Sequence, residues 1–209
     1  MNVQKGLGDM LKLAPVVPVM VIEERAHAVP LARALAAGGL RALEITLRTP
    51  VAMDCIRDIA REVPEAVVGA GTVLSPEQMR DVAAAGARFA VSPGATDGLL
   101  KAAADSGIAY LPGAVTASEI MALRAEGLSF LKFFPAVPAG GTAALAAFAS
   151  VFGDVKFCPT GGVSPQNVRE FLSLSNVVCV GGSWVCPASL VRGRDWAAIT
   201  ALAREACAL

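Results

Sequence analysis

Short runs of β-branched and other apolar residues alternate along the chain with stretches rich in alanine and leucine. The apolar runs are typical of buried strands and predict eight of them, at residues 16–22, 40–47, 66–70, 88–92, 108–111, 128–134, 155–160 and 176–180. In several of the alanine-rich stretches apolar residues recur three or four positions apart, and the stretches predict helices at residues 26–37, 50–62, 76–85, 97–106, 117–126, 142–151 and 165–172. Two further helices are predicted near the chain ends, at residues 4–12 and 195–208.

The predicted strands start roughly 20 to 27 residues apart, which is the length of one strand–helix unit. Strands that alternate with helices of this size pair in parallel, with the helices packed outside the sheet. Eight such units predict an α/β fold, a closed (β/α)8 TIM barrel with an extra N-terminal helix. An open, doubly wound sheet is the alternative. Because no linker or low-complexity segment divides the sequence, residues 1–209 are predicted to form a single domain.

Three of the predicted helices begin with a hydroxyl residue followed by proline: Thr49-Pro50, Ser75-Pro76 and Ser164-Pro165. The hydroxyl can cap the first N–H groups of a helix, and proline is favoured at the first helical position. Each pair therefore marks the end of a loop that leads from a strand into a helix. In a (β/α)8 barrel these loops form the active face, so functional residues are expected at the carboxyl ends of the strands.

The composition narrows the class of protein. Of the 209 residues, 55% are hydrophobic and 17% charged, with a formal net charge of +0. This balance excludes a disordered chain and leaves no broad positive field for nucleic acid or an anionic membrane. The uncharged runs at residues 133–153 and 171–191 approach the length of a membrane span, but prolines and glycine pairs interrupt both. Prolines also interrupt the apolar run at residues 13–22, unlike a signal peptide, so we expect a cytoplasmic protein.

Scarce residue types restrict the chemistry. The 5 cysteines form no C-x-x-C pair, and His27 is the single histidine. These counts argue against disulfides, a zinc site, and Ser-His or Cys-His nucleophilic catalysis. His27 lies at the start of a predicted helix, where we expect a surface or capping role. We expect no metal and no cofactor.

Lys132 lies in the most hydrophobic setting of any charged residue, the segment 130–134. The alternation of side chains along a strand places Phe130, Lys132 and Phe134 on one face, which we predict to point into the barrel. Burial disfavours the ammonium and favours the free amine, which can attack a carbonyl group. A lysine that reaches solvent or pairs with a buried acid is the alternative. Lys156 starts its predicted strand and is expected near the opposite mouth, in a structural role.

The same alternation sends Glu44, Thr46 and Arg48 inward from the second predicted strand. A carboxylate beside a lysine that forms an imine can carry protons through several successive steps. Arg48, at the mouth, can hold a carboxylate with its planar guanidinium. A structural salt bridge between Glu44 and Arg48 is the alternative.

Two glycine pairs, Gly161-Gly162 and Gly181-Gly182, follow the seventh and eighth predicted strands. Barrels of this type frequently bind phosphate at that place through backbone N–H groups. Glycine allows the backbone to approach the anion closely. The two pairs together therefore favour a phosphate site.

Six segments of the sequence resemble the 2-keto-3-deoxy-6-phosphogluconate (KDPG) aldolase family: residues 43–49, 68–73, 92–94, 132–136, 158–162 and 181–184. The likeness runs in order from about residue 15 to the C-terminus. It implies a class I aldolase with a (β/α)8 barrel, usually a homotrimer, that needs no cofactor. Members cleave KDPG, a phosphorylated 2-keto-3-deoxy sugar acid, to pyruvate and glyceraldehyde 3-phosphate. The family is also associated with cleavage of 4-hydroxy-2-oxoglutarate to pyruvate and glyoxylate.

The resemblance also implies roles for individual residues. Lys132 matches the Schiff-base lysine and Glu44 the general acid/base. The remaining matches are substrate contacts: Arg48, Thr72 and Thr160 for the pyruvate carboxylate and substrate, Gly161, Gly162 and Ser183 for the phosphate, and Pro93 and Phe134 as apolar walls. Val137 departs from the family, since many relatives carry glutamate there, and this concerns only the local loop. The alternatives are an aldolase for the galactonate epimer, a phosphosugar epimerase or isomerase, and a non-catalytic phosphosugar-binding module.

Overall fold

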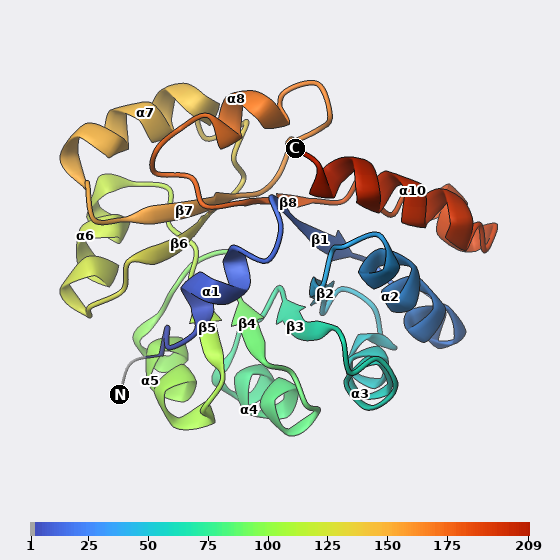
Figure 1. The fold of residues 1–209 in the computed structure, drawn as a ribbon. Coiled ribbons are helices and arrows are strands. Elements are labelled where there is room, and N and C mark those ends of the chain that lie inside the picture. The colour runs from blue at the N-terminus through green and yellow to red at the C-terminus, as the bar shows by residue number, and fades with distance from the viewer. Residues whose placement is uncertain (1–2) are drawn as a thin grey trace.

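The computed structural model describes residues 3–209, in which strands and helices alternate along the chain (Figure 1). The strands are β1 (Val16–Met20), β2 (Ala42–Thr46), β3 (Val67–Gly71), β4 (Phe89–Val91), β5 (Ala109–Leu111), β6 (Phe130–Phe133), β7 (Lys156–Pro159) and β8 (Val180–Gly182). The helices are α1 (Leu7–Leu11), α2 (Ala28–Ala37), α3 (Ala52–Glu62), α4 (Pro76–Ala84), α5 (Asp97–Ser106), α6 (Ala117–Ala125), α7 (Gly141–Val151), α8 (Val168–Leu172), α9 (Ala188–Arg192) and α10 (Trp196–Cys207), and a short 3-10 helix, η1 (Arg25–His27), precedes α2.

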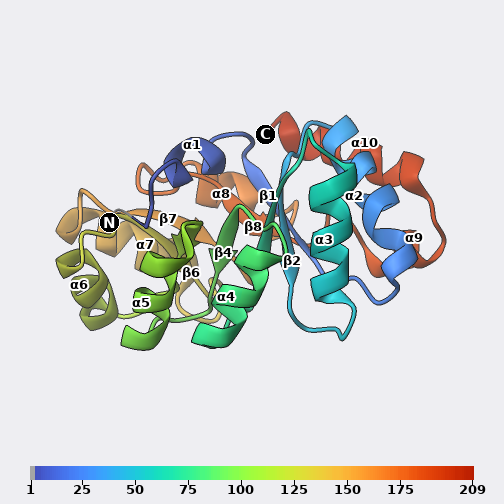
Figure 2. The same ribbon diagram turned by 90° about the horizontal axis from the view of Figure 1, so that it is seen from below.

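The strands form a curled parallel sheet with helices on its outer side (Figures 1 and 2). Six strands pair in the order β5-β4-β3-β2-β1-β8, and β6 pairs with β7. Isolated parallel bridges join Gly113 to Lys132, Phe157 to Val177 and Thr160 to Gly181. The protein is therefore an α/β fold with a curled parallel sheet, and closure into a complete barrel stays a prediction.

Apolar side chains pack in two separate layers, one on each face of the curled sheet. The outer layer, between the strands and the helices, contains Leu131 and Phe133 of β6. The inner layer contains Phe130 of β6 together with Leu7 and Leu11 of α1, which lies over the centre of the sheet in Figure 1. The alternation predicted for this strand is therefore confirmed, because its odd and even positions separate into the two layers.

The eighth strand differs from its prediction. It was expected at residues 176–180 but runs from Val180 to Gly182, so Gly181 and Gly182 belong to the strand instead of following it. An added Cβ on Gly181 would overlap Thr160 Oγ1, and one on Gly182 would overlap the Trp184 ring. Packing this close requires glycine at both positions. Because glycine is a weak strand former, strand propensity placed the predicted strand too early in the sequence.

One of the three predicted caps is confirmed. The Gln78 N–H donates to Ser75 Oγ at 3.2 Å at the start of α4. Thr49 does not cap α3, because its hydroxyl donates to the Ile22 carbonyl at 2.7 Å, and α8 begins at Val168, beyond Ser164. Tertiary contacts and the following loop thus determine two of these helix starts.

The expected surface or capping role of His27 is wrong. Its side chain makes no cap hydrogen bond, and the residue is only 4% exposed. The His27 Nε2 accepts a hydrogen bond from Arg194 Nε at 3.2 Å, and the ring packs edge-on against Trp196 of α10. The imidazole therefore connects η1 to the C-terminal part of the chain.

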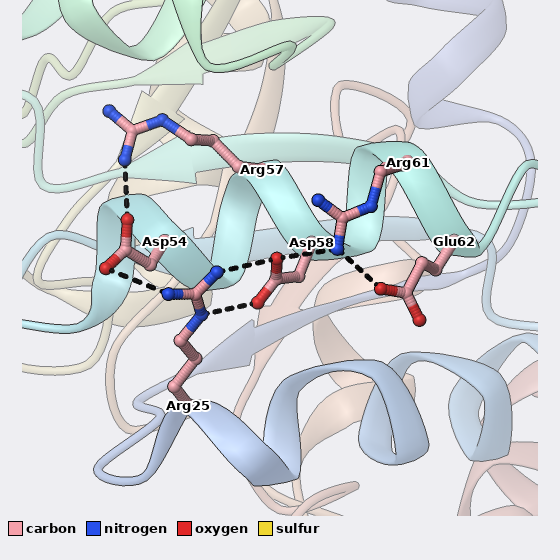
Figure 3. Close-up of polar contacts among 6 residues, drawn as sticks. All are labelled: Arg25, Asp54, Arg57, Asp58, Arg61 and Glu62. Carbon is pink, nitrogen blue, oxygen red and sulfur yellow. Dashed lines mark hydrogen bonds and ion pairs between the residues drawn. The ribbon is translucent and has the colours of Figure 1, made fainter.

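A network of charged side chains holds η1 against α3 (Figure 3). Arg25 donates to both carboxylate oxygens of Asp58, from Nε at 2.6 Å and from Nη2 at 2.9 Å. Arg61 donates to the same carboxylate at 3.1 Å, and Asp54 forms ion pairs with Arg25 and Arg57. The hydrogen bond from Arg25 is the main reason why the pKa of Asp58 lies below its ordinary value. The network fixes the segment that follows β1.

Candidate functional site

Lys132 and Glu44 meet inside the curled sheet. Lys132, on β6, donates from Nζ to Glu44 Oε1, on β2, at 3.2 Å. Both residues are almost fully buried, at 4% and 3% exposure. They are 88 positions apart in the sequence, so only the curvature of the sheet brings them together. The inward orientation predicted for both residues is therefore confirmed.

Glycine makes room for the Glu44 carboxylate. An added Cβ on Gly71, at the end of β3, would overlap Glu44 Oε1 and lie 2.7 Å from its Cγ. Gly71 pairs in register with Thr46, two residues after Glu44 on the neighbouring strand. The carboxylate therefore packs directly on the backbone of β3, which restricts the positions that it can take.

Lys132 and Glu44 carry opposite formal charges and lie in contact away from solvent. At 3.2 Å the ammonium can pass a proton directly to the carboxylate and become a free amine. The Phe134 ring, whose centroid is 5.3 Å from Lys132 Nζ, forms an apolar wall beside the amine. The arrangement can therefore supply a buried nucleophilic amine with its proton carrier in contact.

Two buried cysteines belong to the inner apolar layer. Cys158 pairs in register with Lys132, and Cys179 is fully buried in the same layer. A hydrogen bond with Cys158, burial and the charge of Glu44 together raise the pKa of Cys179, so this thiol stays protonated at neutral pH. The Cys179 thiol is therefore a neutral group near the Glu44 carboxylate. The spacing of the cysteines matches no known motif, so the sequence did not predict this contribution.

Thr160 has an unsatisfied hydroxyl. Its Oγ1 is buried and has no hydrogen-bond partner among residues 3–209. The residue directly follows β7 and bridges to Gly181 of β8. Buried hydroxyl groups are nearly always hydrogen-bonded, so this atom is suited to bind an oxygen atom of a ligand.

Arg48 and Thr72 lie together at the mouth, just beyond β2 and β3. Arg48 is exposed, and its Nε donates to Thr72 Oγ1 at 3.3 Å. Within the described part of the chain Arg48 forms no salt bridge with Glu44, whose carboxylate is paired with Lys132. The guanidinium is therefore placed to meet an anionic group that enters from solvent.

The two glycine segments lie side by side at the ends of β7 and β8. The bridge between Thr160 and Gly181 joins the two strands just before Gly161 and Gly162 on one side and two residues before Ser183, which is exposed, on the other. Both Gly161 and Gly162 have positive φ angles, 98° and 82°, which other residues rarely adopt. The bridge thus places the ends of β7 and β8 on neighbouring strands, and a shared phosphate site at these residues stays a prediction.

Pro93 lies in the loop after β4, and the backbone of this loop packs on Gly113, where an added Cβ would overlap the Pro93 carbonyl. The neighbouring Ser92 donates to the Gly94 carbonyl and shares a 2.6 Å hydrogen bond with the Tyr110 hydroxyl. Burial raises the pKa of Tyr110 to about 12, so its hydroxyl keeps its proton. Nothing in the sequence predicted the contact between Ser92 and Tyr110, although a single tyrosine in a predicted strand was a usable signal.

Lys156 occupies the first position of β7, and its Nζ donates to the Ser175 carbonyl at 3.0 Å. This contact confirms the structural role expected for it. Among residues 3–209, no three His, Cys, Asp or Glu side chains gather as a metal site would require. None of the helices described has both the length and the apolar character of a membrane span.

Comparisons with known proteins identify relatives of this chain. The family model for KDPG and KHG aldolase matches residues 7–202. The KHG/KDPG aldolase of Escherichia coli K12 is 55% identical over 205 residues, which are 98% of this chain and 96% of the relative. The KDPG aldolase of Legionella pneumophila, whose structure holds pyruvate as a covalent carbinolamine, is 48% identical with a TM-score of 0.94, over 96% of this chain and 97% of that one.

The KDPG aldolase of Zymomonas mobilis, solved with 3-phosphoglycerate, is 49% identical with a TM-score of 0.93, over 98% of this chain and 96% of that one. The chain is therefore similar to these relatives in both sequence and fold over nearly its whole length. The chain belongs to the KDPG and KHG aldolase family.

Proposed function

We propose that the protein is a class I aldolase that cleaves KDPG to pyruvate and glyceraldehyde 3-phosphate. Its second activity is the cleavage of 4-hydroxy-2-oxoglutarate to pyruvate and glyoxylate. The observation that carries the proposal is the buried contact of 3.2 Å between Lys132 Nζ and Glu44 Oε1. The family relationship and the carbinolamine of the Legionella pneumophila relative support it.

The reaction begins when Lys132 passes a proton to Glu44 and its free amine attacks the C2 ketone of the substrate. The product is a carbinolamine. Glu44 returns a proton to the C2 hydroxyl, which leaves as water, and a protonated imine forms. The imine carries a positive charge that can accept electrons from the neighbouring bond.

Cleavage follows when the Glu44 carboxylate removes the proton of the C4 hydroxyl. The C3–C4 bond breaks, its electron pair forms the C2=C3 double bond while the π pair of the imine moves to the nitrogen, and glyceraldehyde 3-phosphate leaves. The remaining enamine takes a proton at C3 from Glu44, and water then hydrolyses the protonated imine to pyruvate and the Lys132 ammonium, which restores the starting pair with the Glu44 carboxylate. Glu44 thus carries each proton, and no external oxidant or reductant is needed.

The other site residues bind the substrate. Arg48 and Thr72 hold the carboxylate at the mouth, and the unpaired Thr160 hydroxyl bonds to a substrate oxygen. Backbone N–H groups at Gly161, Gly162 and Ser183 hold the phosphate. Pro93 and Phe134 form apolar walls, with Phe134 placed beside the Lys132 amine.

We also propose that residues 1–209 form one domain, a closed (β/α)8 barrel with an N-terminal helix. The bridges between Gly113 and Lys132 and between Thr160 and Gly181 support closure, because each joins the six-stranded sheet to the β6-β7 pair. A homotrimer in the cytoplasm is proposed from the family resemblance alone. Light scattering tests the trimer, since the chain mass is 21.3 kDa and three chains give three times that value.

An epimerase or isomerase on the same fold would use the phosphate site, but it would not need a buried amine in contact with a carboxylate. The test is therefore reduction with borohydride in the presence of pyruvate, followed by mass analysis of peptides. We expect a pyruvate adduct on Lys132, which is absent from Lys132→Ala. Lys156→Ala, a lysine on the neighbouring strand, is the matched control and keeps the adduct. An adduct that persists in Lys132→Ala would overturn the proposal.

A further inference from the structure

Between β7 and α8 the chain carries one side chain, that of Asn167, whose position the proposed chemistry does not explain. The Asn167 side chain reaches back over the loop that follows β7, which we call the glycine loop (residues 161–164). Its Nδ2 donates to the Gly162 carbonyl at 3.0 Å, and its Oδ1 accepts from the Ser164 N–H at 2.8 Å. Both ends of the amide therefore bind the backbone of the glycine loop.

Helix capping does not account for the bond to the Gly162 carbonyl, although the bond from the Ser164 N–H, three residues back, has the spacing of the return bond of a capping box. Asn167 occupies the position before α8, where an asparagine ordinarily accepts a hydrogen bond from the first turn of the helix. Here its side chain makes no such cap bond. The Nδ2 group is therefore used to hold the Gly162 carbonyl and has no part in starting the helix.

Two carbonyl groups of the glycine loop are held by neighbouring groups. The Gly161 carbonyl accepts from the Val137 N–H at 3.0 Å, and the Gly162 carbonyl accepts from Asn167. In a trans peptide the N–H points opposite to the C=O of the same unit. The N–H groups of Gly162 and Val163 are therefore turned away from Val137 and Asn167. Neither donates a hydrogen bond to any of residues 3–209.

Two successive N–H groups that are unpaired and held in a fixed direction form a site for an anion. We propose that Asn167 is a positioning residue for the phosphate group of the substrate. It holds the Gly162 carbonyl so that the Gly162 and Val163 N–H groups face the phosphate. This inference rests on the proposed function. It implies that Asn167 contributes to the binding of phosphorylated substrates and not to the binding of substrates without phosphate.

The experiment compares KDPG with 4-hydroxy-2-oxoglutarate, which carries no phosphate. In Asn167→Ala we expect KM for KDPG to rise about tenfold, the size of one net hydrogen bond. We expect kcat for KDPG to change less than about twofold, because the phosphate group is bound at a distance from the reacting carbons. For 4-hydroxy-2-oxoglutarate we expect both kcat and KM to change less than about twofold. Gln166→Ala, the exposed neighbour on the same turn, is the matched control and should leave all constants unchanged.

Asn167→Asp is a second variant, which keeps an acceptor for the Ser164 N–H but removes the donor to the Gly162 carbonyl. It should raise KM for KDPG at least as much as Asn167→Ala, because it also adds a negative charge near the phosphate. Equal losses with both substrates, or no change with KDPG in either variant, would overturn the inference. Borohydride trapping of pyruvate on Lys132 distinguishes failure of the two proposals. If the wild type shows no trapped adduct, the proposed function itself is refuted. If the adduct forms but the Asn167 variants show no defect selective for KDPG, only the role of Asn167 is refuted.

Discussion

Gly71→Ala tests whether the position of the Glu44 carboxylate matters, because it leaves both Lys132 and Glu44 in place. The new Cβ would lie 2.7 Å from Glu44 Cγ and 2.8 Å from Cδ, whereas ordinary contacts start at 3.4 Å. The side chain must therefore retreat by about 0.7 Å or more, since atoms at such short range repel steeply. The carboxylate then leaves the place from which it accepts the hydrogen bond of Lys132.

A displacement approaching 1 Å in a catalytic group lowers the rate by about 100-fold. We therefore expect kcat for KDPG to fall by about that factor, and the rate of pyruvate trapping by borohydride to fall as well, because Glu44 moves protons during imine formation. A coupled assay for pyruvate release measures the first quantity, and mass analysis of Lys132 peptides over time measures the second.

Urea unfolding separates this effect from a loss of stability. Overfilling the packed interior is expected to lower the free energy of unfolding by about 1–3 kcal/mol, which can leave the protein folded under assay conditions. Gly153→Ala is the control, because an added Cβ there meets no atom within 4 Å. A folded Gly71→Ala enzyme with the turnover and trapping rates of the wild type would refute the reasoning.

Two further predictions concern the same carboxylate and the charged network. Glu44→Gln keeps the shape of the side chain but cannot carry protons, so kcat for KDPG should fall by about 100- to 10,000-fold, and steady-state assays that find less than a tenfold loss would contradict the role of Glu44. Asp58→Asn should lower the free energy of unfolding by about 1 kcal/mol at pH 7, because Arg25 holds the pKa of Asp58 below 3.8 and its stabilisation is present above that pH. The difference should vanish in urea titrations as the pH falls through the lowered pKa, and an equal loss at pH 7 and pH 2, or the same loss in the exposed control Asp105→Asn, would contradict it.

Period-two alternation was sufficient to orient the two central residues. Lys132 and Glu44 each sit in an apolar strand where neighbouring aliphatic side chains must face the helices, so only the inner face remained for them. The order of strands and helices also followed from local patterns, because each unit has its own apolar periodicity. The predicted boundaries were wrong for β8, where glycine stands in the strand, since close packing and not propensity places it there.

The sequence by itself thus determined the α/β alternation, the inward direction of Lys132 and Glu44, and the glycine segments near the ends of β7 and β8. Only the tertiary structure decided the 3.2 Å contact between Lys132 Nζ and Glu44 Oε1 and the burial of His27 against α10. It also decided that the Glu44 carboxylate packs on Gly71, where a larger residue would overlap it. It also decided the hold of Asn167 on the Gly162 carbonyl. The physical reason is that side-chain periodicity is set by the local backbone, whereas distances between atoms on different elements are set by how the whole sheet curls and packs.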